Sequence, residues 1–255
     1  MATTIAVLSQ KGGTGKTTTT RTLCDVLRRI GLRVLAVDMD PQGNLTDWFA
    51  IGDEPEPTLA DVLMGRSTAP EAVHSDLLPA SIHLAEAELV LNGKIGRELT
   101  LRRALADVDE AYDLILIDCP PSLGLLTVNA LVAAGEALIS TEAEYFSLQG
   151  VEQALEVVEA AKAVNPDLHW LGVVLNIADL RTVHSREAGV QLRESFGDRV
   201  FDTAIRRSVA YAEAAERAAS IVDYRPDLGA DYLALADEIL ARLGRDEDRV
   251  RLASI

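Results

Sequence analysis

The chain is poor in cysteine, in aromatic residues and in positive charge. Its two cysteines, Cys24 and Cys119, lie far apart in apolar surroundings and show no metal-ligand spacing, so we expect two reduced thiols in the core. No apolar run approaches the roughly 20 residues of a membrane span. The formal net charge of −16 excludes a protein that is coated by nucleic acid or drawn as a whole to an anionic membrane. Any binding of either kind must therefore be local.

Linkers and internal repeats are also missing from the 255 residues. No stretch rich in Pro, Gly or Ser divides the chain, and 48% of its residues are hydrophobic, so we predict one domain with a sizeable core over residues 1–255. The sequence enters an apolar strand pattern directly after Met1, without the charged and apolar segments of a secretory leader. We therefore expect a cytoplasmic protein.

Short β-branched apolar runs alternate with longer segments of helical periodicity. The strand-like runs cover residues 5–9, 33–38, 114–118, 137–141 and 171–176. The helical segments cover residues 18–30, 99–108, 122–134, 148–164, 186–196 and 231–243. This alternation predicts an α/β fold, a doubly wound and mostly parallel sheet with helices on both faces. Ligands of such sheets bind at the carboxyl ends of the strands, so the polar residues found there are the candidate site.

The first predicted strand runs into a glycine-rich loop that a helix follows at once. We call this segment the phosphate loop, and its residues are Gln10, Lys11, Gly12, Gly13, Thr14, Gly15, Lys16, Thr17 and Thr18. Glycines let backbone N–H groups approach a phosphate chain closely, and the helix N-terminus attracts its charge. Lys16 suits the β and γ phosphates, and the Thr17 hydroxyl suits Mg²⁺. Gln10 stands where the common GxxxxGK[ST] pattern has glycine, so the loop is a variant form.

Lys11 precedes the glycine pair, at a position that ordinary nucleotide loops leave free. Taken alone, it is either a solvated loop cation or a functional residue. The run KGGTGKTT resembles the deviant Walker A loop of the ParA/MinD superfamily. The resemblance implies a P-loop ATPase in which Lys11 reaches across an ATP-bound homodimer to the partner's phosphates, as an arginine finger does elsewhere.

Two acidic residues end the second predicted strand. Asp38 and Asp40 are spaced by one residue, so we expect both carboxylates on one face. Carboxylates beside a polyphosphate can hold Mg²⁺ or orient the attacking water. The segment DMDPQGN is similar to switch I of the superfamily, which implies that Asp40 activates the water. The alternative is a turn without chemistry, because Asp-Pro and Gly-Asn are common turn residues.

Asp118 ends a third apolar strand and is followed by Cys119 and a double proline. An aspartate at the tip of a buried strand beside the phosphate loop is placed to bind the water shell of Mg²⁺. The segment IDCPPS resembles Walker B running into switch II, which implies a loop that senses the γ-phosphate. Thr17, Asp40 and Asp118 are therefore the candidate Mg²⁺ residues.

The resemblance covers nearly the whole chain, is closest to the chromosomal ParA, or Soj-like, branch and is looser after about residue 177. That branch usually reads IPRN where this chain has IRRS at residues 205–208, and Ala210 replaces a common arginine. Arg206 and Arg207 are therefore hypothetical adenine contacts. Asn176 fits the role of the base-reading asparagine better. The run 176–179 lacks the lysine of the NKxD guanine motif, so ATP is favoured over GTP.

Residues 181–225 hold eight arginines against seven acids, a net charge of +1, whereas the rest of the chain carries −17. The arginines are Arg181, Arg186, Arg193, Arg199, Arg206, Arg207, Arg217 and Arg225. The resemblance implies that the ATP dimer binds DNA non-specifically through a surface in this part, which needs only a few arginines on phosphates. Solvated helix faces with weak ion pairs are the alternative. No helix-turn-helix precedes the ATPase motifs, so we do not expect operator-specific repression.

We therefore predict an ATPase that forms an ATP sandwich dimer and partitions or positions DNA or cargo with a ParB-like partner, nucleoid-associated in its ATP state. Two alternatives remain. A MinD-like membrane switch needs a basic amphipathic C-terminal helix, but residues 244–255 mix three arginines with three acids and have no aromatic anchor. A nucleotide-gated scaffold would hydrolyse ATP negligibly. A cluster-bearing relative such as the nitrogenase iron protein is disfavoured, because paired thiolates are missing.

Overall fold

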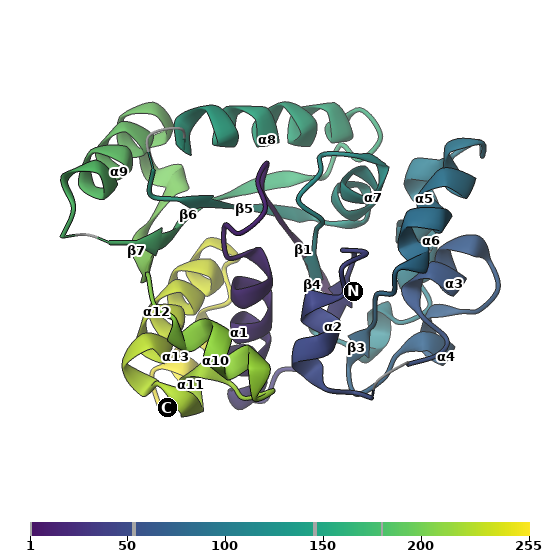
Figure 1. The fold of residues 1–255 in the computed structure, drawn as a ribbon, viewed down its shortest axis with the longest axis horizontal. Coiled ribbons are helices and arrows are strands. Elements are labelled where there is room, and N and C mark those ends of the chain that lie inside the picture. Colours follow the sequence, from purple (N-terminus) through teal and green to yellow (C-terminus); the bar gives the residue numbers. More distant parts are fainter. Residues whose placement is uncertain (1, 53–54, 145–146, 180) are drawn as a thin grey trace.

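The computed structural model describes residues 2–52, 55–144, 147–179 and 181–255. Its centre is a parallel sheet of seven strands in the order β3-β2-β4-β1-β5-β6-β7 (Figure 1). The strands are β1 (Thr3–Leu8), β2 (Val34–Asp38), β3 (Leu77–Leu78), β4 (Leu114–Asp118), β5 (Glu136–Glu142), β6 (His169–Ala178) and β7 (Val200–Arg206). The predicted doubly wound α/β fold is confirmed.

Alternation along β1 divides the interior into two cores. Ala6 and Leu8 face one core, whereas Ile5 and Val7 face the other, because successive side chains of a strand point to opposite faces of the sheet. All four side chains are fully buried. Because helices cover both faces of the sheet, residues 5–8 of β1 are all apolar and do not alternate with polar residues.

Helices cover both faces of the sheet, and α7 and α8 lie on the side opposite to α1 and α12 (Figure 1). On the face of Ile5 lie α1 (Lys16–Arg29), α2 (Asn44–Phe49), α10 (Ala210–Glu216), α11 (Ile221–Tyr224), α12 (Pro226–Arg242) and α13 (Asp246–Leu252). On the other face lie α3 (Leu59–Met64), α4 (Ala69–Ala72), α5 (His83–Asn92), α6 (Thr100–Leu105), α7 (Leu125–Ala133), α8 (Ser147–Lys162) and α9 (Val183–Phe196). Three 3₁₀ turns, η1 (Arg97–Leu99), η2 (Asp109–Ala111) and η3 (Gly197–Arg199), complete the described elements.

The observed elements differ from the sequence predictions in three places. The helix predicted over residues 99–108 is α6 flanked by the 3₁₀ turns η1 and η2, and the helix predicted from residue 122 begins only at Leu125. The C-terminal segment, for which no helix was predicted, forms α13 and buries Leu252 against the core around α12. The sequence also did not predict β3, β7, the helices α2 to α5, or the helices α10 and α11.

Candidate functional site

A cleft of about 600 Å³ opens at the carboxyl ends of the strands, where the phosphate loop faces the end of β6 and the segments after β2, β4 and β7. A volume of this size suits a nucleotide-sized ligand. Its walls are built by Gly12, Gly13, Gly15, Lys16, Thr17, Thr18, Asp40, Gln42, Asn44, Trp48, Pro121, Asn176, Ile177, Ile205, Arg206, Arg207, Ser208, Val209, Tyr211, Ala212, Ala215 and Tyr232. Most of the predicted site residues therefore come together in one place.

The phosphate loop needs two of its glycines for backbone reasons. Gly13 and Gly15 have φ angles of +80° and +82°, in the left-handed region that side chains disfavour. A Cβ on Gly15 would also lie 3.1 Å from Cγ of Asn176. Gly15 caps α1, so the helix starts at Lys16 with its first N–H groups at the cleft. This arrangement is the one that binds phosphate at a helix N-terminus.

Lys16 is buried and held by the loop itself. Its Nζ donates to Oγ of Ser9 at 3.0 Å and to the carbonyl oxygen of Lys11 at 3.2 Å. Thr14 donates from Oγ1 to the same Ser9 hydroxyl at 2.9 Å. Burial lowers the pKa of Lys16, whereas Asp118 and other nearby acids raise it. The ammonium group is thus fixed in a position from which a phosphate could take over these hydrogen bonds.

Thr17 lines the cleft and contacts Asp118, which is buried and does not itself line the cleft. Thr17 Oγ1 donates to Oδ2 of Asp118 at 2.7 Å, while Oδ1 of Asp118 is buried and has no hydrogen-bond partner within the described residues. Burial and the neighbouring Asp38 raise the pKa of Asp118 to about 8. The raised pKa means that the surroundings of Asp118 do not fully stabilise its negative charge. A hydrated cation would stabilise that charge, and its water could donate to the unpaired oxygen. The described chain holds no cluster of three or more His, Cys, Asp or Glu side chains for a metal, so Mg²⁺ would depend on phosphate oxygens for further ligands.

Asp38 and Asp40, which were predicted to share one face, have different surroundings at the end of β2. Asp38 is fully buried and accepts hydrogen bonds from N and Oγ1 of Thr46, at 2.9 and 2.8 Å, and from N of Asp40 at 3.1 Å. Burial raises its pKa to about 6. Asp40 instead lines the cleft, and its Oδ1 accepts from N of Gln42 at 3.0 Å. Asp38 therefore shapes the turn that presents Asp40.

Asn176 lies beneath the phosphate loop with a fixed amide orientation. Its Nδ2 donates to Oγ1 of Thr19 at 3.1 Å and to Oγ of Ser140 at 2.7 Å. Since both amide hydrogens have protein acceptors, the side-chain carbonyl is the group that can accept a further hydrogen bond. An acceptor of this kind suits the amino group of adenine better than the carbonyl of guanine.

Arg206 and Arg207 both line the cleft, but only Arg206 forms an ion pair with another of the described residues. Arg206 Nε lies 2.8 Å from Oδ2 of Asp231, and its Nη2 donates to the carbonyl oxygen of Asp227. We therefore assign Arg206 to the wall of the cleft. Sequence reasoning missed the aromatic residues here, Trp48, Tyr211 and Tyr232, because α2, α10 and α12 bring them together only in the folded chain.

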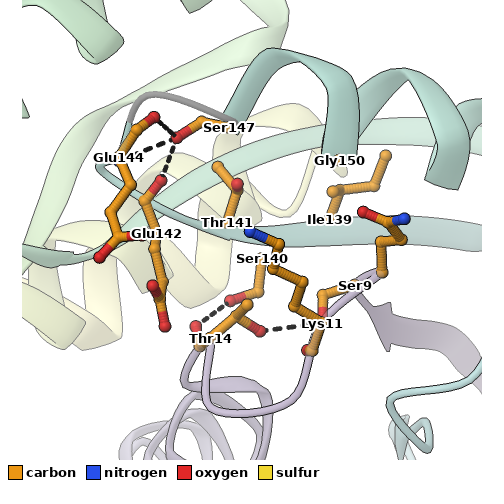
Figure 2. A pocket seen from close by; sticks show the side chains of 11 residues that line it. Ser9, Lys11, Thr14, Ile139, Ser140, Thr141, Glu142, Glu144, Ser147 and Gly150 are labelled. Atoms are coloured by element: carbon orange, nitrogen blue, oxygen red, sulfur yellow. Dashed lines mark hydrogen bonds between the residues drawn. The ribbon is translucent and has the colours of Figure 1, made fainter.

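Lys11 does not line this cleft. Figure 2 shows its side chain extended from the phosphate loop over β5 toward Thr141 and Glu142, in a small second pocket. Burial and Glu144 raise the pKa of Glu142, whereas the Lys11 ammonium lowers it. Within one chain, Lys11 is therefore directed away from the wall that Lys16 and Thr17 form.

All eight arginines of residues 181–225 are exposed, but most of their guanidinium groups are engaged within the chain. Three form ion pairs: Arg181 with Asp179, Arg206 with Asp231, and Arg225 with Asp227. Arg193 and Arg199 donate to backbone carbonyl oxygens, and Arg217 stacks on the ring of Tyr224. In the part of the chain that the structure describes, the side chains of Arg186 and Arg207 form no hydrogen bond or ion pair. These two are the arginines most available to a polyanion.

Known proteins are similar to this chain in sequence and in fold. A family model described as an AAA domain matches residues 2–170. The sporulation initiation inhibitor protein Soj of Bacillus subtilis is 42% identical over 247 residues, which cover 93% of this chain and 98% of that protein. Cobyrinic acid a,c-diamide synthase of Mycobacterium smegmatis, solved with an ATP analogue and magnesium, is 38% identical with a TM-score of 0.75, over 86% of this chain and 93% of that one.

The septum site-determining protein MinD of Pyrococcus horikoshii, solved with Mg-ADP, has a TM-score of 0.76 and 27% identity, over 94% of this chain and 96% of that one. The two solved structures thus contain magnesium and an adenine nucleotide or its analogue, the cofactors expected from the phosphate loop. Among the described helices of the present chain, none is both long and apolar enough to cross a membrane.

Proposed function

Because the chain belongs to the ParA/MinD superfamily of P-loop ATPases, in its Soj-like branch, we propose that it is a nucleotide-switched positioning ATPase whose residues 1–255 act as one domain. Two copies would enclose two Mg·ATP molecules, and hydrolysis would separate them. The observation that carries the proposal is that the two lysines of the phosphate loop line two different pockets, Lys16 the cleft and Lys11 the smaller second pocket. Lys16 would serve the nucleotide of its own chain, and Lys11 would serve that of a second copy.

The phosphates bind to the loop amides and to the Lys16 ammonium, which exchanges its contacts with Ser9 and the Lys11 carbonyl for phosphate oxygens. Thr17 ligates Mg²⁺ through its hydroxyl, and the unpaired Oδ1 of Asp118 binds a water of the ion's shell. When bound, Mg²⁺ neutralises charge on the phosphates during transfer.

Asp40 orients the attacking water, because it is the acidic residue of the cleft wall and stands on the turn that Asp38 and Thr46 hold. Lys11 of the second copy adds positive charge near the transferred phosphoryl group. Asn176, through its side-chain carbonyl, and the aromatic wall with Tyr211 would hold the adenine base, and the carbonyl would accept from its amino group. Arg207 remains a candidate contact to the base or ribose.

DNA is the proposed partner of the ATP-bound dimer, which would hold the protein on the nucleoid. Arg186 and Arg207 are the first candidates for phosphate contacts, because their guanidinium groups are exposed and unpaired in the described chain. A ParB-like protein would stimulate hydrolysis, release the dimer from DNA and so move or space a chromosome, plasmid or protein cargo. The strongly acidic remainder of the chain limits such contacts to this surface.

A mobility shift on random-sequence duplex DNA tests the proposal. We would compare the apo, ADP and ATP forms of Asp40→Ala, which should bind ATP without hydrolysing it, at one fixed salt concentration. A shift only with ATP, weakened by Arg186→Ala, which lies outside the cleft wall, and unaffected by Arg225→Ala, is expected. If light scattering confirms an ATP dimer and no shift appears, the DNA surface is refuted and a membrane or protein partner becomes the function to test.

A further inference from the structure

The loop after β4, residues 119–124, ends at α7, and the start of α7 is bound by a side chain of α5. Oε1 of Glu88, on α5, accepts a hydrogen bond of 3.1 Å from N of Leu125, the first residue of α7. The contact is close, since a Cβ on Gly124 would lie 3.0 Å from the same oxygen. Gly124 caps α7 without a side chain, so Glu88 supplies the carboxylate that a local cap usually provides.

The other end of this loop is also held, and the loop touches the nucleotide cleft between its two ends. N of Cys119 donates to the carbonyl oxygen of Val7 at 3.1 Å, which continues the pairing of β4 with β1. Pro121 lines the cleft, with its Cβ 3.8 Å from where a Cβ on Gly12 would lie. The carbonyl oxygen of Ser122, in the middle of the loop, also accepts from Oγ1 of Thr127 on α7 at 2.6 Å. The position of α7 therefore helps to decide where the loop lies beside the phosphates.

We propose that Glu88 is a positioning residue: by fixing the start of α7, it holds the loop 119–124 in the position that the loop needs when ATP is bound. The inference rests on the proposed function, in which this loop responds to the γ-phosphate. Glu88 touches no nucleotide and acts through the N-terminus of α7. Without it, α7 would begin later or shift, and Pro121 would lose its place beside the phosphate loop. ADP, which lacks the γ-phosphate, should then bind as before.

Three variants of the full chain test this assignment: Glu88→Ala, Glu88→Gln and the control Glu86→Ala. Glu86 is an exposed acid on the same helix, so its variant makes the same change of charge without the contact to α7. Amide hydrogen exchange of residues 125–128 is measured first, without nucleotide. We expect faster exchange in Glu88→Ala, near-normal exchange in Glu88→Gln, whose amide oxygen still accepts, and no change in Glu86→Ala.

Nucleotide assays then separate positioning from simple stabilisation. For Glu88→Ala we expect about tenfold slower turnover at saturating ATP, the order that one lost hydrogen bond to a charged group produces, with ADP affinity unchanged. Glu88→Gln should recover most of the rate. Normal turnover in Glu88→Ala, or an equal loss of ADP affinity, would overturn the assignment.

The two proposals fail in different ways. A wild-type chain that hydrolyses no ATP, even with DNA and a ParB-like partner, would refute the proposed function, while the amide exchange would still decide the contact between Glu88 and α7. Hydrolysis by the wild type together with an unaffected Glu88→Ala variant would refute this inference alone.

Discussion

Thr17 and Asp118 are joined by a 2.7 Å hydrogen bond from Oγ1 to Oδ2, which ties the first turn of α1 to the end of β4. The bond leaves the other carboxylate oxygen of Asp118 buried and unpaired within the described chain. An unpaired buried oxygen is costly, so a hydrated cation held at this point would stabilise the site as well as the nucleotide. The pair is thus prepared for Mg²⁺ by the fold.

The contribution of Mg²⁺ to nucleotide binding should therefore depend on the Thr17 hydroxyl. We expect Thr17→Ala to weaken binding of ATP with Mg²⁺ by about tenfold or more, because a ligand to the ion and a partner of Asp118 are lost together. Binding in EDTA should change much less. Thr17→Ser, which keeps the hydroxyl, is the control, and titration calorimetry with and without Mg²⁺ is the measurement. An equal loss in both conditions would contradict the assignment.

The two lysines of the phosphate loop should have separable effects. Lys11 lies outside the cleft wall, so Lys11→Ala should bind ATP within about threefold of the wild type but fail to dimerise with it. Lys16→Ala removes a buried phosphate ligand and should lose binding itself. Light scattering gives the mass and a fluorescent ATP analogue gives the affinity. A wild-type ATP-dependent mass for Lys11→Ala would remove the proposed role in a second copy.

Both cysteines should be nearly unreactive in the folded protein. Cys24 and Cys119 are fully buried, and burial raises the pKa of Cys24 to about 12 and also that of Cys119. The reactive thiolate is disfavoured below that pKa, so native labelling between pH 7 and 9 should be far slower than labelling of a free thiol at the same pH. A chromogenic disulfide should titrate two thiols at once in denaturant. Fast native labelling at pH 8 would contradict the burial.

Gly172, within β6, should tolerate no side chain. A Cβ there would lie 2.5 Å from the carbonyl oxygen of Arg199 and 2.8 Å from the ring of Phe201, so backbone must move. We expect Gly172→Ala to destabilise the fold by about 1–3 kcal/mol or more, as overpacking of a core does. Gly93→Ala is the control, since a Cβ at Gly93 meets only one atom, at 3.8 Å. Urea denaturation of both variants gives the comparison.

The parts of the site that depend on local sequence could be predicted. Gly13 and Gly15 specify a left-handed backbone, and an apolar strand ending in Asp118 places that acid at the sheet edge. The five strands proposed from apolar runs are present, because each is long enough to show a run of buried apolar residues in the sequence. β3 has two residues, too few for any periodic signal.

The remainder depends on packing that spacing alone does not reveal. Asp38 and Asp40 were expected on one face of a strand. The strand ends at Asp38, however, and the Asp38 carboxylate accepts two hydrogen bonds from Thr46 on α2. The aromatic wall of the cleft joins Trp48 with Tyr211, which are distant in sequence and carry no motif. Glu88 is likewise an ordinary helix acid until the fold places it at the start of α7.

The central place of β1 in the sheet also bears on how the chain is made. The phosphate loop is among the first segments to leave the ribosome, yet β1 pairs only with residues 114–118 and 136–139. At ordinary synthesis rates these partners follow roughly ten seconds later. The nascent chain thus carries every residue of the loop well before the strands that shape it exist. Nucleotide binding should consequently appear late in translation, and a chain that stops before β5 should bind none.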